Sequence, residues 1–299
     1  MKAKRLKTYQ AHSGSLYALA EGRTNGTFFS GGADKVVAEW SLAKAEPNEF
    51  AIRTDHTIYS LLNLHSQTLL IGTIVGGIHV IDLVEKREVR HLKLHDKGIF
   101  YFVSLREKQQ VIACSADGSI SVWNTLDWSL ERHIRLSHEK IRRAAFNAEI
   151  SVAAIACGDG TIQLLRTDHW EVTESIKAHE DGANSVAFLP DGTLLSGGKD
   201  ALLKQWDPTS MVLLQAIPAH NFAIYDIVRL GDSELIATVS RDKTVKLWHP
   251  QDMQNPLRLD RKTHQAHLNS VNAGLWLETE QILLTCGDDR TIIAWAVEA

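Results

Sequence analysis

Residues 197–206 read Gly-Gly-Lys-Asp-Ala-Leu-Leu-Lys-Gln-Trp, which places Asp200 six residues ahead of Trp206. The Asp position returns every 41 to 47 residues along the chain. A fixed period of this length indicates a repeat architecture in which each repeat is one supersecondary unit. The complete pairs are Asp34 and Trp40, Asp117 and Trp123, Asp200 and Trp206, Asp242 and Trp248, and Asp289 and Trp295, with degenerate copies at Asp159 and Leu165 and at Val75 and Ile81.

A histidine keeps the same period, so the sequence predicts seven units. Within the fifth unit, short runs of β-branched and apolar residues alternate with turn residues such as Pro190-Asp191-Gly192, a pattern typical of consecutive antiparallel strands. Four strands in about 42 residues make one blade of a propeller. The landmark histidines are His12, His56, His95, His138, His179, His220 and His267.

The two ends of the chain complement each other. The seventh unit stops just after Trp295 and lacks a fourth strand, whereas residues 4–12 supply a fourth strand and its histidine with nothing before them. Gln10-Ala-His12 and Gln265-Ala-His267 are the same tripeptide. We therefore expect the first strand to complete the last blade and close the ring.

These residues resemble the WD40 repeat family over essentially the whole chain. The resemblance implies an all-β, seven-bladed β-propeller with four antiparallel strands per blade, in one domain of residues 1–299. Units two and four depart from the pattern because they have lost the Trp. The expected blades are 12–54, 55–94, 95–137, 138–178, 179–219, 220–266, and 267–299 together with 1–11.

Composition excludes several classes of function. A net charge of −4 gives no general attraction to nucleic acid. Cys114, Cys157 and Cys286 are odd in number and lie in apolar runs, so we interpret them as buried thiols in a reducing compartment. There is neither a secretory signal nor an apolar stretch long enough to span a membrane. We expect a cytoplasmic protein, soluble and monomeric as a ring.

Four units combine His, Ser or Thr, Asp and Trp, which invites a hydrolase interpretation. An enzyme needs one nucleophile in one pocket, whereas here the set is repeated, so we interpret it as the structural network of the WD40 family. No Cys pair, His-Glu-x-x-His motif or phosphate-binding loop occurs, and we expect no catalytic residues, metal or cofactor. The four sets are His12, Ser30, Asp34, Trp40; His179, Ser196, Asp200, Trp206; His220, Thr238, Asp242, Trp248; and His267, Thr285, Asp289, Trp295.

The residues that the repeat does not dictate are candidates for partner binding. In propellers of this family, the second residue of each first strand points to the mouth of the central channel. We call these seven residues the mouth residues: Tyr17, Tyr59, Phe100, Arg142, Asn184, Tyr225 and Asn272. Two residues before them stand Ser15, Thr57, Gly98, Lys140, Gly182, Ala223 and Ser270, and just before the Asp position stand Ala33, Ile74, Ala116, Gly158, Lys199, Arg241 and Asp288.

Four aromatic mouth residues form an expected apolar floor, and Lys140, Arg142, Lys199 and Arg241 make one sector positive. Aromatic and Arg side chains in a concave centre are typical of binding hot spots. The leading hypothesis is a non-catalytic interaction scaffold or adaptor that holds a protein or peptide there, through an apolar or aromatic side chain with acidic neighbours. The alternatives are a structural subunit that uses the side or opposite face of the ring, and an enzyme on a propeller scaffold.

Overall fold

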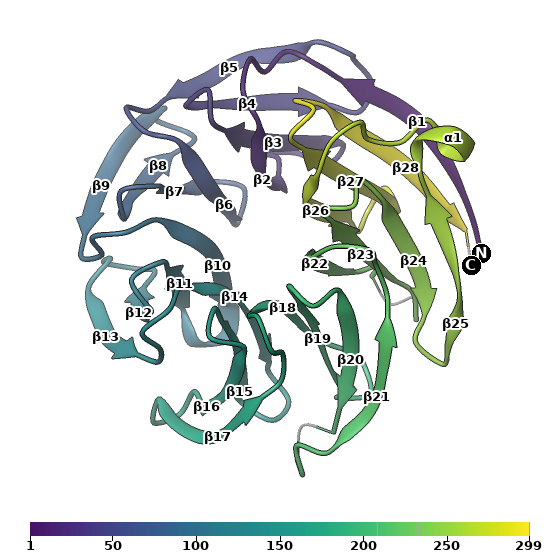
Figure 1. Cartoon of the computed structure of the whole chain (residues 1–299). Coiled ribbons are helices and arrows are strands. Elements are labelled where there is room, and N and C mark those ends of the chain that lie inside the picture. Colours follow the sequence, from purple (N-terminus) through teal and green to yellow (C-terminus); the bar gives the residue numbers. More distant parts are fainter. Residues whose placement is uncertain (208, 232–233, 299) are drawn as a thin grey trace. The chain divides into compact units, whose positions relative to one another are not determined.

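The computed structural model describes residues 1–207, 209–231 and 234–298. Within these residues the strands form seven four-stranded sheets, and neighbouring strands run antiparallel (Figure 1). The protein is a seven-bladed β-propeller, as the sequence predicts. One short 3-10 helix, η1 (Arg106–Lys108), and one helical turn, α1 (Arg261–His264), connect strands. No described helix has the length and apolar character needed to cross a membrane.

The strands follow one another in chain order within each of the first three blades. Blade 1 consists of β2 (Leu16–Glu21), β3 (Thr27–Gly32), β4 (Val36–Ser41) and β5 (Pro47–Arg53). Blade 2 consists of β6 (Ile58–Leu64), β7 (Thr68–Thr73), β8 (Gly77–Asp82) and β9 (Arg87–Lys93). Blade 3 consists of β10 (Ile99–Leu105), β11 (Gln110–Ser115), β12 (Ser119–Asn124) and β13 (Leu130–Arg135).

The next three blades repeat this order. Blade 4 consists of β14 (Ile141–Asn147), β15 (Val152–Cys157), β16 (Thr161–Arg166) and β17 (Glu171–Lys177). Blade 5 consists of β18 (Ala183–Phe188), β19 (Leu194–Gly198), β20 (Leu202–Trp206) and β21 (Leu213–Pro218). Blade 6 consists of β22 (Ile224–Arg229), β23 (Ile236–Ser240), β24 (Val245–His249) and β25 (Asp252–Leu259).

Blade 7 combines β26 (Val271–Leu277), β27 (Ile282–Gly287) and β28 (Ile292–Glu298) with β1 (Lys2–Tyr9) from the other end of the chain. The register pairs Lys2 with Glu298 and Tyr9 with Ile292, with one bulge between Arg5 and Lys7. The prediction that the first strand completes the last blade is confirmed (Figure 1).

Burial decreases from the inner strands of a blade to the fourth. In blade 4, every residue of β15 is buried, whereas β17 is exposed at six of its seven residues. The inner strands are accordingly rich in Ala, Ile and Val, and the outermost strand carries Glu, Thr, Ser and Lys. This division matches a small sheet that packs both faces on its neighbours and presents its last edge to solvent.

The chain divides into two compact units. Unit 1 comprises residues 1–71, 80–89 and 225–299, and unit 2 comprises residues 72–79 and 90–224. In unit 1, one apolar core joins β2, β3 and β4 to β26, β27 and β28. Tyr9 is 1% exposed in this core, with its ring centre 5.1 Å from that of Phe28 and 5.6 Å from that of Trp40. Burial raises the pKa of Tyr9 to about 12. Strand β1 therefore pairs with blade 7 while its last side chain packs into blade 1.

In unit 2, two apolar cores lie between neighbouring blades. One joins β11 and β12 to β14 and β15, and the other joins β15 and β16 to β18 and β19. Cys114 and Cys157 are fully buried in the first of these cores, and burial raises the pKa of both thiols. Cys286 of unit 1 is also buried, and none of the three forms a disulfide. The interpretation of the cysteines as buried thiols is confirmed.

Candidate functional site

The predicted polar network is present in blades 1, 5 and 7. In blade 1, Trp40 Nε1 donates to Ser30 Oγ at 2.7 Å, and Ser30 Oγ lies 2.7 Å from His12 Nε2. His12 Nδ1 in turn lies 2.7 Å from the Asp34 carboxylate. The same bonds occur in blade 5 for His179, Ser196, Asp200 and Trp206, and in blade 7 for His267, Thr285, Asp289 and Trp295, all between 2.8 and 3.0 Å.

The direction of these bonds follows from the donors. An indole N–H can only donate, so the Ser or Thr oxygen accepts from Trp. An ionised carboxylate can only accept, so a neutral histidine carries its proton on Nδ1, and Nε2 accepts from the Ser or Thr hydroxyl. The proton on His Nδ1 then faces the carboxylate. This is the polarity of a hydrolytic triad, but the Ser30, Ser196 and Thr285 side chains are 0% exposed and bonded to an indole. A substrate cannot reach such an oxygen, so the network stabilises the blade.

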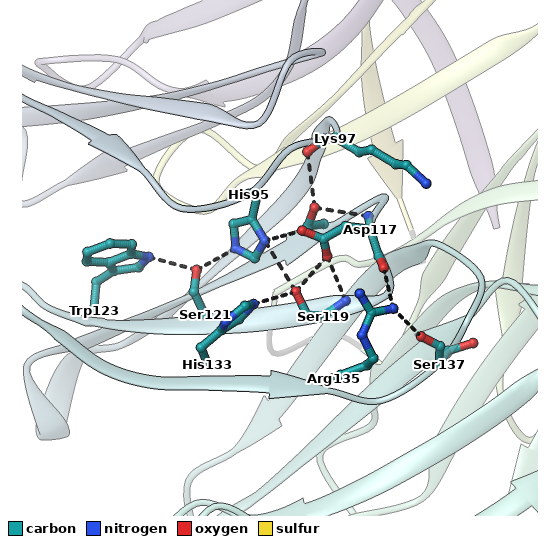
Figure 2. Close-up of polar contacts among 10 residues, drawn as sticks. His95, Lys97, Asp117, Ser119, Ser121, Trp123, His133, Arg135 and Ser137 are labelled. Carbon is teal, nitrogen blue, oxygen red and sulfur yellow. Dashed lines mark hydrogen bonds and ion pairs between the residues drawn. The ribbon is translucent and has the colours of Figure 1, made fainter.

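Blade 3 builds the network from a different strand. Ala113 stands on β11 at the place of Ser30, yet Trp123 Nε1 still donates to a hydroxyl, that of Ser121 on β12, at 2.7 Å (Figure 2). His95 Nε2 lies 2.8 Å from the same oxygen. Ala113 and Ser121 are paired across β11 and β12. In blade 3 the hydroxyl is thus on Ser121, the cross-strand partner of Ala113, and the spacing of the repeat does not predict a hydroxyl at that position.

Ser119 links this network to the outermost strand of blade 3. Its hydroxyl donates to Asp117 at 2.6 Å and lies 2.9 Å from His133 Nε2, on β13 (Figure 2). Burial raises the pKa of Asp117, but hydrogen bonds from Ser119 and His95 outweigh burial and leave that pKa below its usual value. Burial lowers the pKa of His95, and Asp117 offsets this only in part. At neutral pH, Asp117 is therefore ionised and His95 is neutral, which are the charge states that the network requires.

Two groups of side chains among the described residues have the chemistry of metal ligands, and one of them lies wholly in unit 2. Ligand atoms of His95, Asp117 and His133 lie within 4.8 Å of one another. Both ring nitrogens of His95 are already in hydrogen bonds, so this group is part of the structural network. His79 and His91 of blade 2 stack with ring centres 4.3 Å apart. The sequence pattern predicts neither cluster, because both depend on cross-strand pairing.

Two landmark histidines do not occupy the network position. His138 is exposed, and the preceding Ser137 is buried and donates to Asp159 at 2.6 Å. The network residue lies 22 positions before the Asp in blades 1, 3 and 7, and that position in blade 4 is Ser137, one residue before the landmark His138. His56 is exposed as well, in the blade where Val75 replaces the Asp.

In blade 6, Trp248 Nε1 donates to Thr238 Oγ1 at 2.8 Å. This part of the predicted network of unit six is confirmed. His220, the landmark histidine of the same repeat, is 7% exposed.

Neighbouring mouth residues contact one another. In unit 1, the rings of Tyr17 and Tyr59 meet edge to face with centres 5.2 Å apart. In unit 2, the Arg142 guanidinium lies 4.7 Å from the centre of the Phe100 ring. All four side chains are partly exposed. Their contacts restrict the rotamers of large side chains that still reach solvent, which is what a preorganised recognition surface requires.

The two asparagines at the mouth positions bridge neighbouring blades. Asn184 is 4% exposed, and its amide donates to the Ile224 carbonyl at 2.9 Å. Asn272 donates to the Leu16 carbonyl at 2.9 Å and to the Asp288 carboxylate at 2.8 Å. Each accepting carbonyl belongs to the residue just before the next mouth residue. These amides fix the spacing of first strands.

Backbone hydrogen bonds join the other two predicted sets, the residues two before the mouth residues and the residues just before the Asp position. The N–H just before the Asp position donates to the carbonyl of the residue two before the mouth residue. Lys199 donates to Gly182 at 2.9 Å, and Gly158 donates to Lys140 at 2.7 Å. The same bond joins Ala33 to Ser15, Ala116 to Gly98, and Asp288 to Ser270.

The structure brings Lys140, Arg142 and Lys199 together on blades 4 and 5. Arg142 and Lys199 both contribute to lowering the pKa of Lys140, after the larger effect of burial. Arg241 is exposed and belongs to unit 1. Tyr225 is partly buried against the core of blades 6 and 7.

Comparison with known proteins agrees with this geometry. The model of the WD domain, G-beta repeat, matches residues 3–41, 86–124, 170–207, 211–249 and 260–296, which is more than half of the chain. The chain belongs to the WD40 family. Each matched segment ends within a residue of a landmark Trp: Trp40, Trp123, Trp206, Trp248 or Trp295. The two units in which that Trp is replaced have no matched segment ending at the corresponding position.

Individual relatives are longer proteins. The chain is 31% identical over 129 residues to nuclear distribution protein nudF of Aspergillus flavus, which covers 42% of this chain and 28% of nudF. It is 21% identical over 299 residues to human striatin-3, covering 81% of this chain and 34% of striatin-3. It is 23% identical over 197 residues to WD repeat-containing protein 90 of Xenopus tropicalis, covering 60% of this chain and 11% of the relative. The chain thus spans about a third or less of these relatives.

Proposed function

We propose that this protein is a non-catalytic scaffold that holds a peptide segment of another protein at the mouth residues, in the cytoplasm. WD40 propellers generally bind protein partners, and the repeated, buried hydroxyls of this chain are unsuited to nucleophilic catalysis. The proposal adds the face and the type of segment to that general role.

The observation that carries the proposal is the pairing of partly exposed mouth residues. Tyr17 with Tyr59, and Phe100 with Arg142, present aromatic faces whose orientation is fixed by a neighbour. Aromatic and Arg side chains of this kind dominate binding energy at interfaces. An apolar or aromatic side chain of the partner would pack on them, and acidic residues would approach the cations of blades 4 and 5.

The test is affinity capture from a lysate of the source organism with wild type and a Tyr17→Ala/Phe100→Ala variant, both shown to be folded by thermal melting. We expect proteins enriched by wild type to be lost with the variant. The matched control is Leu126→Ala. Leu126 is exposed and follows the end of β12, so it lies at the opposite end of that strand from the Asp117 turn. Equal capture by wild type and the double variant would refute binding at the mouth.

A second candidate is a structural subunit that assembles through the opposite end of the blades. Leu126, Val212 and Leu214 of unit 2 are 72%, 56% and 57% exposed, at or near the connections between third and fourth strands. Loss of capture with Leu126→Ala, and not with the mouth variant, would support this candidate.

A further inference from the structure

Three cations gather on blades 4 and 5 of unit 2. Lys140 immediately precedes β14, Arg142 is the second residue of that strand, and Lys199 follows β19. The carbonyl of Lys140 accepts from Gly158 N at 2.7 Å, and Lys199 N donates to the Gly182 carbonyl at 2.9 Å. The backbone of both lysines is therefore fixed by the blades that carry them.

Two glycines bring the lysine side chains close. A Cβ at Gly182 would lie 2.9 Å from the Gly158 carbonyl oxygen and 3.2 Å from Lys199 Cε. A Cβ at Gly158 would lie 3.0 Å from Lys140 Cγ. Any larger residue would have to displace one of the lysine stems. The two stems thus flank the contact between Gly158 and Gly182.

Neither lysine of the cluster forms an ion pair among the described residues. Among the described residues, no carboxylate oxygen lies within 4.0 Å of the Lys140 or Lys199 ammonium group. Burial lowers the pKa of Lys140, and the charges of Arg142 and Lys199 lower it further, against the opposite effect of Glu139. The guanidinium of Arg142 is held over Phe100 at 4.7 Å. An anion bound here would relieve repulsion among three cations.

We propose that Lys140, Arg142 and Lys199 form a binding site for a phosphate monoester, carried by a phosphorylated serine or threonine of the partner segment. Such a group has a charge of about −1.5 to −2 at neutral pH and three strong acceptor oxygens. The planar guanidinium can bind two of these oxygens, and each ammonium adds a point charge. A carboxylate has one charge and two oxygens and matches three cations less well. That the phosphate is carried by a partner protein rests on the proposed function.

The site itself is tested with inorganic phosphate on the full chain, labelled with 15N at Lys and Arg, in NMR titrations at constant ionic strength. The pH is set near 7.5, at which a phosphate monoester, with a second pKa of about 6, is almost fully doubly charged. We expect a saturable shift of the Arg142 Nε resonance with phosphate, and about tenfold weaker binding of acetate because of its single charge. A response that does not saturate, or equal binding of acetate, would overturn the proposal.

Variants locate the response. Lys140→Gln and Lys199→Gln should each weaken phosphate binding by about tenfold, the effect of losing one charged hydrogen bond of about 1.5 kcal/mol. The matched control is Lys97→Gln, which removes an exposed lysine ahead of β10, two residues before Ile99. If Lys97→Gln weakens phosphate binding as much as the other two variants do, the binding reflects the overall positive charge of the surface, and the proposal fails.

The source of the phosphate is tested by capture before and after phosphatase treatment of the lysate. We expect a captured protein to be lost after treatment and to be lost with Lys140→Gln/Lys199→Gln. Capture that survives phosphatase overturns the phosphorylated segment, even if inorganic phosphate binds. If wild type captures nothing at all while phosphate binds at the cluster, the scaffold function fails and the anion site stands.

Discussion

Ala113 on β11 and Ser121 on β12 are register partners, and the hydroxyl that Trp123 needs lies on Ser121. In blade 1 the same pair is reversed, with Ser30 on β3 opposite Ala38 on β4. A hydroxyl on either strand therefore reaches the indole and the histidine. The network therefore requires a hydroxyl oxygen at one place between the indole and the histidine, and either of two paired sequence positions can supply it.

Exchanging the two residues should restore blade 3. Ser121→Ala leaves Trp123 Nε1 and His95 Nε2 without their partner and should lower the free energy of unfolding by about 1–3 kcal/mol. Adding Ala113→Ser should recover most of this loss, because it recreates the arrangement of blade 1. Thermal or urea unfolding of the three proteins measures it. A double variant no more stable than Ser121→Ala would show that the two positions are not equivalent.

The buried histidine of blade 3 should make stability depend on pH. The folded pKa of His95 is lowered by burial and by nearby His133, and is raised only in part by Asp117 and Asp96. Because the unfolded chain takes up the proton more readily, this contribution is complete above about pH 6.5 and is lost as pH falls through and below that value.

Melting temperatures between about pH 8 and pH 5 test this, with His133→Gln as the informative variant. Removing His133 takes away one of the effects that lower the pKa of His95, so the melting temperature should fall less steeply. An unchanged slope would indicate that other groups control the acid response. Asp289, whose pKa is lowered to about 2, should add a separate loss below about pH 4.

The bridging amide of Asn184 should be worth more than an exposed amide. Asn184→Ala removes a buried donor to the Ile224 carbonyl and should cost about 1–3 kcal/mol. Asn255→Ala, at an exposed position of β25, should change stability by about 0.5 kcal/mol or less. Chemical denaturation compares them. Equal, small effects would mean that the carbonyl is readily satisfied by water.

Tyr9 should be the most sensitive residue of β1. Tyr9→Ala opens a cavity between Phe28 and Trp40 and should cost about 3–5 kcal/mol, by analogy with other large aromatic residues in cores. Tyr9→Phe should be nearly neutral, since the one hydrogen bond that its hydroxyl makes to a described residue is long, at 3.4 Å, to the Leu42 carbonyl. Differential scanning calorimetry of both variants measures this, and equal melting temperatures would contradict the prediction.

The fold was predictable because Asp and Trp recur at a constant spacing, and because the chain ends are complementary. The hydroxyl of Ser121 was not, because finding it requires the pairing of β11 with β12, which the spacing of landmarks does not reveal. The contact of Ser137 with Asp159 was not predictable either, because the landmark histidine of that unit, His138, is the next residue along the chain.

For the mouth residues, the position in the strand was predictable from the sequence, and the side-chain contacts were less so. First-strand periodicity predicted that each of the seven residues is the second of its strand, as the structure has it. It could not distinguish Tyr17, which contacts another side chain, from Asn184, whose amide donates to a backbone carbonyl. That distinction depends on the backbone of the next blade. The gathering of Lys140 with Lys199 likewise depends on how Gly158 and Gly182 meet.

The pairing of β1 with β28 also sets an order of events during synthesis. Residues 2–9 leave the ribosome well before their partners at 292–298. At about 5–20 residues per second, the first strand waits roughly 15–60 s for its partner. During that time it is an unpaired strand, and Lys2, Lys4, Arg5 and Lys7 give it the like charges that discourage pairing with other chains. We therefore expect the basic residues of β1 to discourage association with other chains until β28 has been synthesised.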